Sequence, residues 1–177
     1  MNTTPLLQAR QLSHGWPGLT LFDRLDVDIH PGITLLTGEE GCGKSTLLRL
    51  LASREPGLTF LADIQHPALD NEPVAALLAA VPRGLIDDFG LAEHLGKPLY
   101  MLSTGSRRKV GLCQTLASPA PVLLIDQPVA ALDPPSVRCL VAHLQRIGQL
   151  PGRAVVVADH ESPPGLTPDH TVVLPAR

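Results

Sequence analysis

The sequence predicts an α/β protein with a largely parallel central sheet. Residues 33–37, 122–125 and 154–158 form three short, mostly apolar runs, as expected for strands that are covered on both faces. Segments with helical character separate these runs, and alternating strands and helices build parallel sheets. A glycine-rich turn at residues 38–43 joins the first run to a helix containing residues 47–51. We therefore expect an α/β fold whose first strand and helix are linked by a glycine loop.

Length and composition favour a single compact domain. The chain has 177 residues, 44% of them hydrophobic but only 3% aromatic, so its core must consist mainly of aliphatic side chains. The net charge is −3 and no dense run of Lys and Arg is present, so we do not expect a nucleic acid partner. The first residues lack the features of a signal peptide, and every apolar run is far shorter than the roughly 20 residues that span a bilayer. These observations predict a soluble, cytoplasmic protein.

The first elements carry the pattern of an antiparallel pair. Residues 6–12 and 25–30 alternate between apolar and polar side chains, which is typical of strands with one exposed face. Pro31 and Gly32 form a turn before the first buried strand. Residues 58–64 predict a further strand after the first helix. The antiparallel part is therefore expected to precede the parallel sheet.

Residues 70–118 have a different character and are expected to be mainly helical. Asn71 is a candidate N-cap for a helix that starts at Pro73. Stretches rich in Ala and Leu continue to Gly96, and another helix is predicted from near Ser103 to about residue 117. This segment is interpreted as a helical insertion into the α/β core.

The last third of the chain returns to alternating strands and helices. Asp133 is a candidate N-cap for a helix with Pro134 at its first position, which runs to about residue 147. Residues 171–174 predict a final strand at the edge of the sheet. We therefore expect one domain, with a core at about 1–69 and 119–177 and a helical subdomain at about 70–118.

Residues 38–45 fit the pattern G-x-x-x-x-G-K-[ST] between a strand and a helix. In such a loop the glycines let backbone N–H groups turn toward phosphates, and the helix N-terminus adds a favourable dipole. Lys44 is expected to reach the β- and γ-phosphates, and the Ser45 hydroxyl to bind Mg²⁺. The residues predicted to bind the nucleotide here are Gly38, Glu39, Glu40, Gly41, Cys42, Gly43, Lys44, Ser45 and Thr46.

A second nucleotide motif ends the buried run at residues 122–126. Asp126 lies where phosphate-loop ATPases and GTPases place the aspartate that helps to hold Mg²⁺. A buried strand that ends in Asp is common, so this motif gains its meaning from the segments around it. Those segments are Leu-Ser-Thr-Gly-Ser at 102–106, Ala-Leu-Asp at 131–133, and His160 after the next strand.

This ordered set resembles the ATP-binding cassette (ABC) family of ATPases, and the resemblance covers nearly the whole chain. The family's signature segment matches residues 102–106 and its D-loop matches 131–133. Its Q-loop glutamine, switch histidine and adenine-stacking aromatic match Gln65, His160 and Trp16. The short architecture is also similar to the small ATPase of the cytochrome c haem-export system.

The resemblance implies roles for these residues. Trp16 would stack on adenine, Gln65 would contact Mg²⁺ or the attacking water, and His160 would hydrogen-bond the γ-phosphate. Ser103 and Gly105 would contact the γ-phosphate held by a second subunit, which implies a homo- or heterodimer with two bound ATP molecules. An integral membrane transporter subunit would be the further partner, at the cytoplasmic face. Simpler structural roles remain open: Trp16 as packing and Gln65 as a polar residue at a strand end.

Three departures from the family pattern bear on activity. Gln127 stands where the family usually has Glu, and a neutral amide cannot accept a proton from water, so we expect slow hydrolysis with intact ATP binding. Thr104 adds a side chain to the signature segment where a glycine is usual. The interval from Lys44 to Gln65 and the helical insertion are both short. Alternatively, Gln127 orients water well enough, or a partner's intact site carries hydrolysis.

Two rival functions also fit the sequence. The chain would be a degenerate subunit that binds ATP and regulates or scaffolds a partner, or an ABC ATPase outside transport. Cys42, Cys113 and Cys139 lie far apart and show no C-x-x-C spacing, so neither a disulfide framework nor a structural zinc site is expected. Cys42 lies at a helix N-terminus, where a thiol is more easily ionised and oxidised. The six histidines other than His160 are interpreted as exposed or structural.

Overall fold

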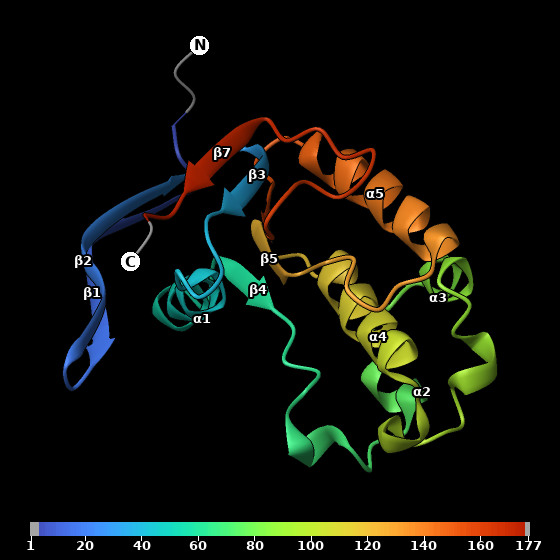
Figure 1. Ribbon diagram of the computed structural model, residues 1–177. Helices are drawn as coiled ribbons and strands as arrows, with labels where there is room; N and C mark the ends of the chain where they lie inside the picture. The colour runs from blue at the N-terminus through green and yellow to red at the C-terminus, as the bar shows by residue number, and fades with distance from the viewer. Residues whose placement is uncertain (1–3, 176–177) are drawn as a thin grey trace.

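The computed structural model describes residues 4–175, and its central feature is a parallel sheet of five strands in the order β4–β5–β6–β3–β7 (Figure 1). All four neighbouring pairs are parallel, as the sequence predicted for this part of the chain. The strand bounds are β3 Gly32–Thr37, β4 Thr59–Leu61, β5 Val122–Asp126, β6 Ala154–Ala158 and β7 His170–Val173. The last strand lies at an edge, as expected.

One predicted strand is shorter than the sequence suggested. The apolar run at residues 58–64 forms a strand only over β4, which pairs with β5 through Leu61 and Leu124. β4 is an edge strand with β5 as its only neighbour in the sheet, so pairing ends where that register ends. The chain then leaves the sheet, so Gln65 lies in an irregular segment after the strand.

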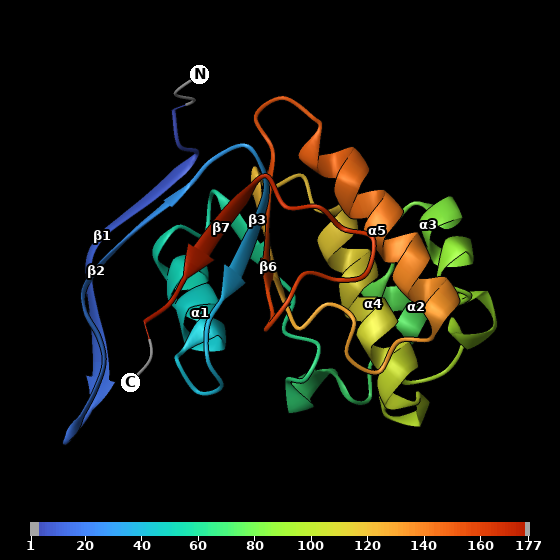
Figure 2. The same cartoon turned by 45° about the horizontal axis from the view of Figure 1, so that its top comes forward.

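Helices cover the two faces of the sheet unequally (Figure 2). α1 (Lys44–Arg54) packs on one face with the apolar side chains of Leu124 and Val156. α4 (Thr104–Ala117) and α5 (Pro134–Gly148) pack on the other face, against Ile125 and Val157. Successive residues of β5 and β6 therefore pack into two different cores, one on each face of the sheet. This explains why β6 is apolar throughout and why β5 is apolar at every position before Asp126.

The antiparallel part is a long hairpin of β1 (Leu7–Trp16) and β2 (Leu19–Ile29), which extends along the α1 side of the molecule (Figure 1). The predicted pairing is confirmed, with Leu7 opposite Ile29, but both strands are longer than predicted. Gln11 and Arg24 each have a φ of 51° and lie where the register shifts. Such irregularities interrupt the alternation by which the sequence reveals a strand.

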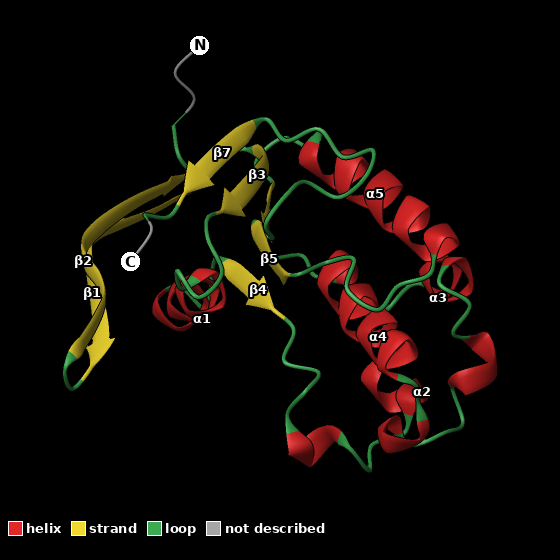
Figure 3. Cartoon of the chain, viewed as in Figure 1, coloured by secondary structure: helices red, strands yellow, loops and turns green. Residues whose placement is uncertain are grey.

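The segment between β4 and α4 is built from short helices (Figure 3). The predicted N-cap at Asn71 is wrong: Pro73 occupies that position and no side chain caps the helix. In α2 (Val74–Leu77), the first two backbone N–H groups instead donate hydrogen bonds to the carbonyl oxygens of Lys97 and Leu95, at 3.0 and 2.9 Å respectively. A tertiary contact thus replaces a capping side chain. The remaining short elements are the 3₁₀ turns Pro67–Leu69, Ala92–His94 and Leu99–Met101, and helix α3 (Arg83–Asp88).

The predicted helix start near Ser103 and the predicted cap at Asp133 are confirmed. Ser103 Oγ accepts a hydrogen bond from the Ser106 amide at 3.1 Å at the start of α4. Asp133 Oδ1 accepts one from the Ser136 amide at 2.9 Å at the start of α5, with Pro134 in the first turn. Within residues 4–175, none of the helices is long and apolar enough to cross a membrane.

The core on the α1 side gives a direct test of this packing. Leu47 is fully buried between α1 and the sheet. We expect Leu47→Ala to lower the free energy of unfolding by about 2–5 kcal/mol, because it removes buried methyl groups and leaves a cavity. Leu150→Ala is the matched control, since Leu150 is 46% exposed, and should change it by less than about 0.5 kcal/mol. Equal losses in urea unfolding would contradict this assignment of the core.

Candidate functional site

The loop between β3 and α1 has a backbone that depends on glycine. Gly38, Gly41 and Gly43 have φ values of 147°, 78° and 103°, which side chains rarely allow. A Cβ on Gly38 would lie 2.8 Å from Cys42 Sγ, and one on Gly43 would lie 2.8 Å from the ring of Phe22. The glycines are therefore required both for the turn and for close packing against the hairpin.

Lys44 lies within the curve of this loop. Its ammonium group donates hydrogen bonds to the carbonyl oxygens of Gly38 and Glu39, at 2.9 and 3.0 Å. The Leu47 amide already binds the Gly43 carbonyl at 2.8 Å, which starts α1 directly after the loop. A lysine and a helix N-terminus thus meet at one place, an arrangement that attracts phosphate.

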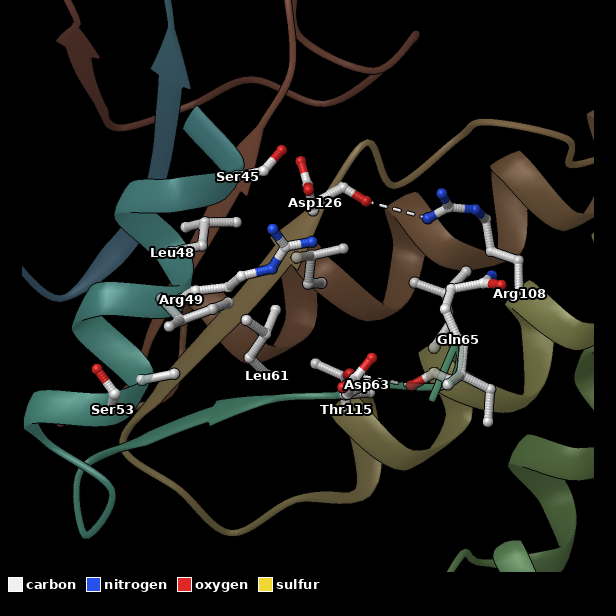
Figure 4. Close-up of a pocket in the computed structure, with 17 residues that line it drawn as sticks. Ser45, Leu48, Arg49, Ser53, Leu61, Asp63, Gln65, Arg108, Thr115 and Asp126 are labelled. Carbon is white, nitrogen blue, oxygen red and sulfur yellow. Dashed lines mark hydrogen bonds between the residues drawn. The ribbon is translucent and has the colours of Figure 1, made fainter. Parts of the chain in front are cut away.

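A pocket of about 490 Å³ opens beside α1 and is lined by all three predicted metal-binding residues, with Gln65 on the side opposite Ser45 (Figure 4). Ser45 comes from the first turn of α1, Asp126 from the end of β5, and Gln65 from the segment after β4. Figure 4 shows the side chains of Ser45 and Asp126 next to each other at one end of the pocket. Hydroxyl, carboxylate and amide oxygens are ligands that suit Mg²⁺.

Two arginines line the same pocket, and sequence reasoning did not identify them. Arg49 lies on α1, one turn after Ser45, and Arg108 lies on α4. Arg108 donates a hydrogen bond to the backbone oxygen of Asp126 at 3.0 Å, which ties α4 to the end of β5. The spacing of Ser45 and Arg49, four residues apart on one helix, was the available signal for Arg49.

Gln127 and His160 lie at the same carboxyl edge of the sheet but do not line this pocket. Gln127 has a φ of 45°, and its backbone N–H donates a hydrogen bond to the Ala158 carbonyl oxygen at 2.8 Å, so the chain turns sharply after Asp126. The His160 carbonyl accepts a hydrogen bond from Thr37 Oγ1 at 2.7 Å. Because Thr37 ends β3, this bond places His160 beside the entrance to the phosphate loop.

Trp16 lies near the tip of the hairpin and also stands outside the pocket. It is 52% exposed, and its ring meets that of His14 edge-on at 5.2 Å. Phe22, which pairs with His14 across the hairpin, packs against Gly43. The hairpin therefore approaches the phosphate loop while leaving an exposed indole face further along.

The signature residues Ser103 and Gly105 do not line the pocket, although Arg108, one turn further along α4, does. They lie at the start of α4, which covers the opposite face of the sheet from α1 (Figure 2). A Cβ on Gly105 would lie 2.5 Å from the carbonyl oxygen of Ala131, so the signature segment and the D-loop of one chain are in close contact. Neither signature residue is among those that line the pocket of Ser45 and Asp126.

An ion pair joins α4 to the end of the D-loop. Lys109 Nζ lies 2.7 Å from Asp133 Oδ2. The hydrogen bond from Lys109, followed by those from the amide and hydroxyl of Ser136, holds the pKa of Asp133 well below its usual range. Asp133 therefore both caps α5 and binds α4.

Comparison with known proteins shows the family of this chain. It is 32% identical over 195 residues to a cytochrome c biogenesis ATP-binding export protein, CcmA 1, of Cupriavidus metallidurans, covering 90% of this chain and 93% of that protein. It is 30% identical to the zinc import ATP-binding protein ZnuC of Halorhodospira halophila, covering 89% and 68%. An ATP-binding subunit of an ABC transporter has a similar structure, with a TM-score of 0.73 at 18% identity over 86% of this chain and 78% of the other. No protein-family profile matches the chain.

Fold, motifs and relatives agree: the chain belongs to the ABC family of ATPases, as an ATP-binding subunit of an ABC transporter. Its likeness to the cytochrome c export ATPases is also confirmed. ABC ATPases in general bind ATP with Mg²⁺ and hydrolyse it. The particular roles of the site residues in this chain remain predictions.

The pair between Lys109 and Asp133 predicts a defined pH dependence. Asp133→Asn keeps the capping oxygen but removes the charge, so we expect lower stability at pH 7. The folded-state pKa is lowered, so this stabilisation is complete above the unfolded-state pKa of about 3.9 and is lost as pH falls toward the folded-state value.

Urea unfolding from pH 8 to 4 measures this difference between the parent protein and Asp133→Asn. It should be constant above about pH 5 and should shrink below that. Asp87→Asn is the control, because Asp87 forms an exposed i,i+4 pair with Arg83 and should contribute little. A difference that grows on acidification would be inconsistent with the pair.

Proposed function

We propose that this subunit binds Mg·ATP between its phosphate loop and the carboxyl edge of its sheet. The observation that carries the proposal is the meeting of Ser45, Gln65 and Asp126 in one pocket beside the loop that holds Lys44. Lys44 and the loop amides would bind the β- and γ-phosphates. The three oxygen donors would hold Mg²⁺, which neutralises charge on the phosphates.

The adenine and γ-phosphate would be bound by residues at the margins of this pocket. We propose that the exposed face of Trp16 stacks on adenine, since indole offers a large π surface and Trp16 is not packed in the core. His160 would donate a hydrogen bond to the γ-phosphate from its place next to β3. The two guanidinium groups of Arg49 and Arg108 favour an anion in the pocket.

Hydrolysis is proposed to be slow because Gln127 occupies the place where the family usually has a glutamate that accepts a proton from water. Its amide can orient a water molecule but cannot accept its proton, and a positioned base typically contributes about 10²–10⁴ in rate. ATP binding does not need that proton transfer. Gln127 and Thr104 also support a second candidate function: a subunit that binds ATP and regulates a partner without useful turnover.

A complete site is proposed to need two chains arranged head to tail. Support comes from Ser103 and Gly105 being absent from the lining of the pocket that contains Ser45 and Asp126. The free amides at the start of α4 would meet the γ-phosphate held by the other chain. The partner would be a second copy or a related ABC subunit.

We further propose that the dimer works with an integral membrane subunit at the cytoplasmic face. The chain spans 93% of a relative that is named as an export protein of cytochrome c biogenesis. Isolation from solubilised membranes, followed by identification of associated chains, tests this step. A bound integral membrane protein is the expected result, and a soluble complex alone would favour an ABC ATPase outside transport.

Placing a glutamate at position 127 tests the slow-hydrolysis proposal. We expect Gln127→Glu to raise steady-state ATP turnover by about 10²-fold or more, because it supplies a base next to the attacking water. Adding Lys44→Ala to the Gln127→Glu variant should remove that gain. Fast turnover in the parent protein that is lost in Lys44→Ala would contradict the proposal, and no gain in Gln127→Glu would favour the regulatory function.

ATP-dependent association tests the two-chain site. With Mg·ATP we expect the protein to shift from monomer to dimer in analytical ultracentrifugation, and the shift should be lost in Ser103→Arg, whose side chain blocks the start of α4. ATP binding by the Ser103→Arg monomer should persist, since Ser103 does not contact its own loop. Loss of binding together with dimerisation would place the signature segment in the chain's own site.

A further inference from the structure

A cluster of three potential metal ligands lies outside the nucleotide pocket, between α3 and α5. Asp88 ends α3, and Cys139 and His143 lie on α5. One ligand atom from each of the three lies within 4.8 Å of the others. Sequence reasoning did not identify this cluster, because Asp88 is distant in the chain and the two α5 residues lack a zinc-motif spacing.

The helix geometry and local contacts hold the ligands in place. Cys139 and His143 are four residues apart, so their side chains lie on the same side of α5. His143 Nε2 lies 3.1 Å from Asp88 Oδ2, and the ring stacks on Phe89 at 6.3 Å. The imidazole is mostly covered, with 12% of its side chain exposed, whereas Asp88 is 54% exposed and gives access from solvent.

We propose that Asp88, Cys139 and His143 form a zinc-binding site that joins α3 to α5. Thiolate, imidazole and carboxylate are the three ligand types of zinc, and three protein ligands leave a fourth position for water. A tetrahedral site separates its ligand atoms by roughly 3–4 Å, which small side-chain rotations would reach here. The soft thiolate favours zinc over Mg²⁺, so the site would not compete with the nucleotide's metal.

The charges of the cluster suit a divalent cation. Burial, and then the nearby Asp88 carboxylate, raise the pKa of Cys139, so the thiol keeps its proton unless a cation compensates the negative charge. Zinc would displace the thiol proton to solvent and neutralise both groups. Arg146, which is exposed and lies 2.8 Å from His143 Nδ1, would turn away as the ring proton moves from Nε2 to Nδ1.

Cobalt and zinc titrations of the full-length, nucleotide-free protein test the site. We expect one Co²⁺ per chain with a thiolate-to-cobalt charge-transfer band, and its displacement by Zn²⁺. Cys139→Ser should abolish the band, and Asp88→Asn or His143→Ala should weaken zinc binding by more than the 10–100-fold typical of losing a second-shell partner. Zinc should also raise the melting temperature of the parent protein but not that of Cys139→Ser.

Control variants separate this site from other ligands. Cys42→Ser and His66→Ala, which lie elsewhere in the fold, should retain the band and the zinc affinity, and Lys44→Ala should do so whatever happens to ATP binding. Circular dichroism checks that each variant is folded. No stoichiometric binding by the parent protein, or unchanged binding in folded Cys139→Ser, would overturn the proposal and leave His143 and Asp88 as a hydrogen-bonded pair between α5 and α3.

Discussion

The close packing of a glycine loop between β3 and α1 is the constraint on which the rest of this structure depends. The loop is confined on one side by Phe22 of the hairpin and on another by Leu174, whose carbonyl oxygen would lie 2.9 Å from a Cβ at Gly38. Both neighbours belong to the core that α1 forms with the sheet. The hairpin and the end of the chain therefore support a backbone conformation that the loop could not hold alone, and its amides remain directed by tertiary packing.

The carboxyl edge of the sheet turns this loop into a site. In parallel sheets, the residues that follow neighbouring strands gather at one edge, where ligands bind. Here that edge brings Asp126 into the pocket and places His160 next to the end of β3. Gln127 is held by Ala158 in the same region. Residues from distant parts of the sequence thus meet because their strands are neighbours, and the two arginines of the pocket would balance the charge of the proposed anionic ligand.

The sequence identified those parts of the fold whose signals are local. Apolar runs predicted the inner strands, and Ser103 and Asp133 marked correct helix starts because each caps its own amides. Asn71 failed as a cap because backbone carbonyls from Leu95 and Lys97 replaced it, which only the folded chain reveals. The hairpin was underestimated where bulges break its alternation. Arg108 and the Asp88 cluster depend on contacts between distant segments, which no single stretch of sequence carries, whereas Arg49 could have been found from its spacing to Ser45 on one helix.

The contacts of α4 bear on how two chains would act together. Arg108 binds the backbone of Asp126, Lys109 binds Asp133, and Gly105 packs against Ala131. The start of α4 is therefore held by contacts with the strand that carries Asp126 and with the D-loop of the same chain. In the proposed head-to-tail dimer, the surface that a chain offers to its partner's ATP would then move with the edge that holds its own Mg²⁺. Binding at one site would bias the other through these three contacts, because a shift of α4 alone would break them.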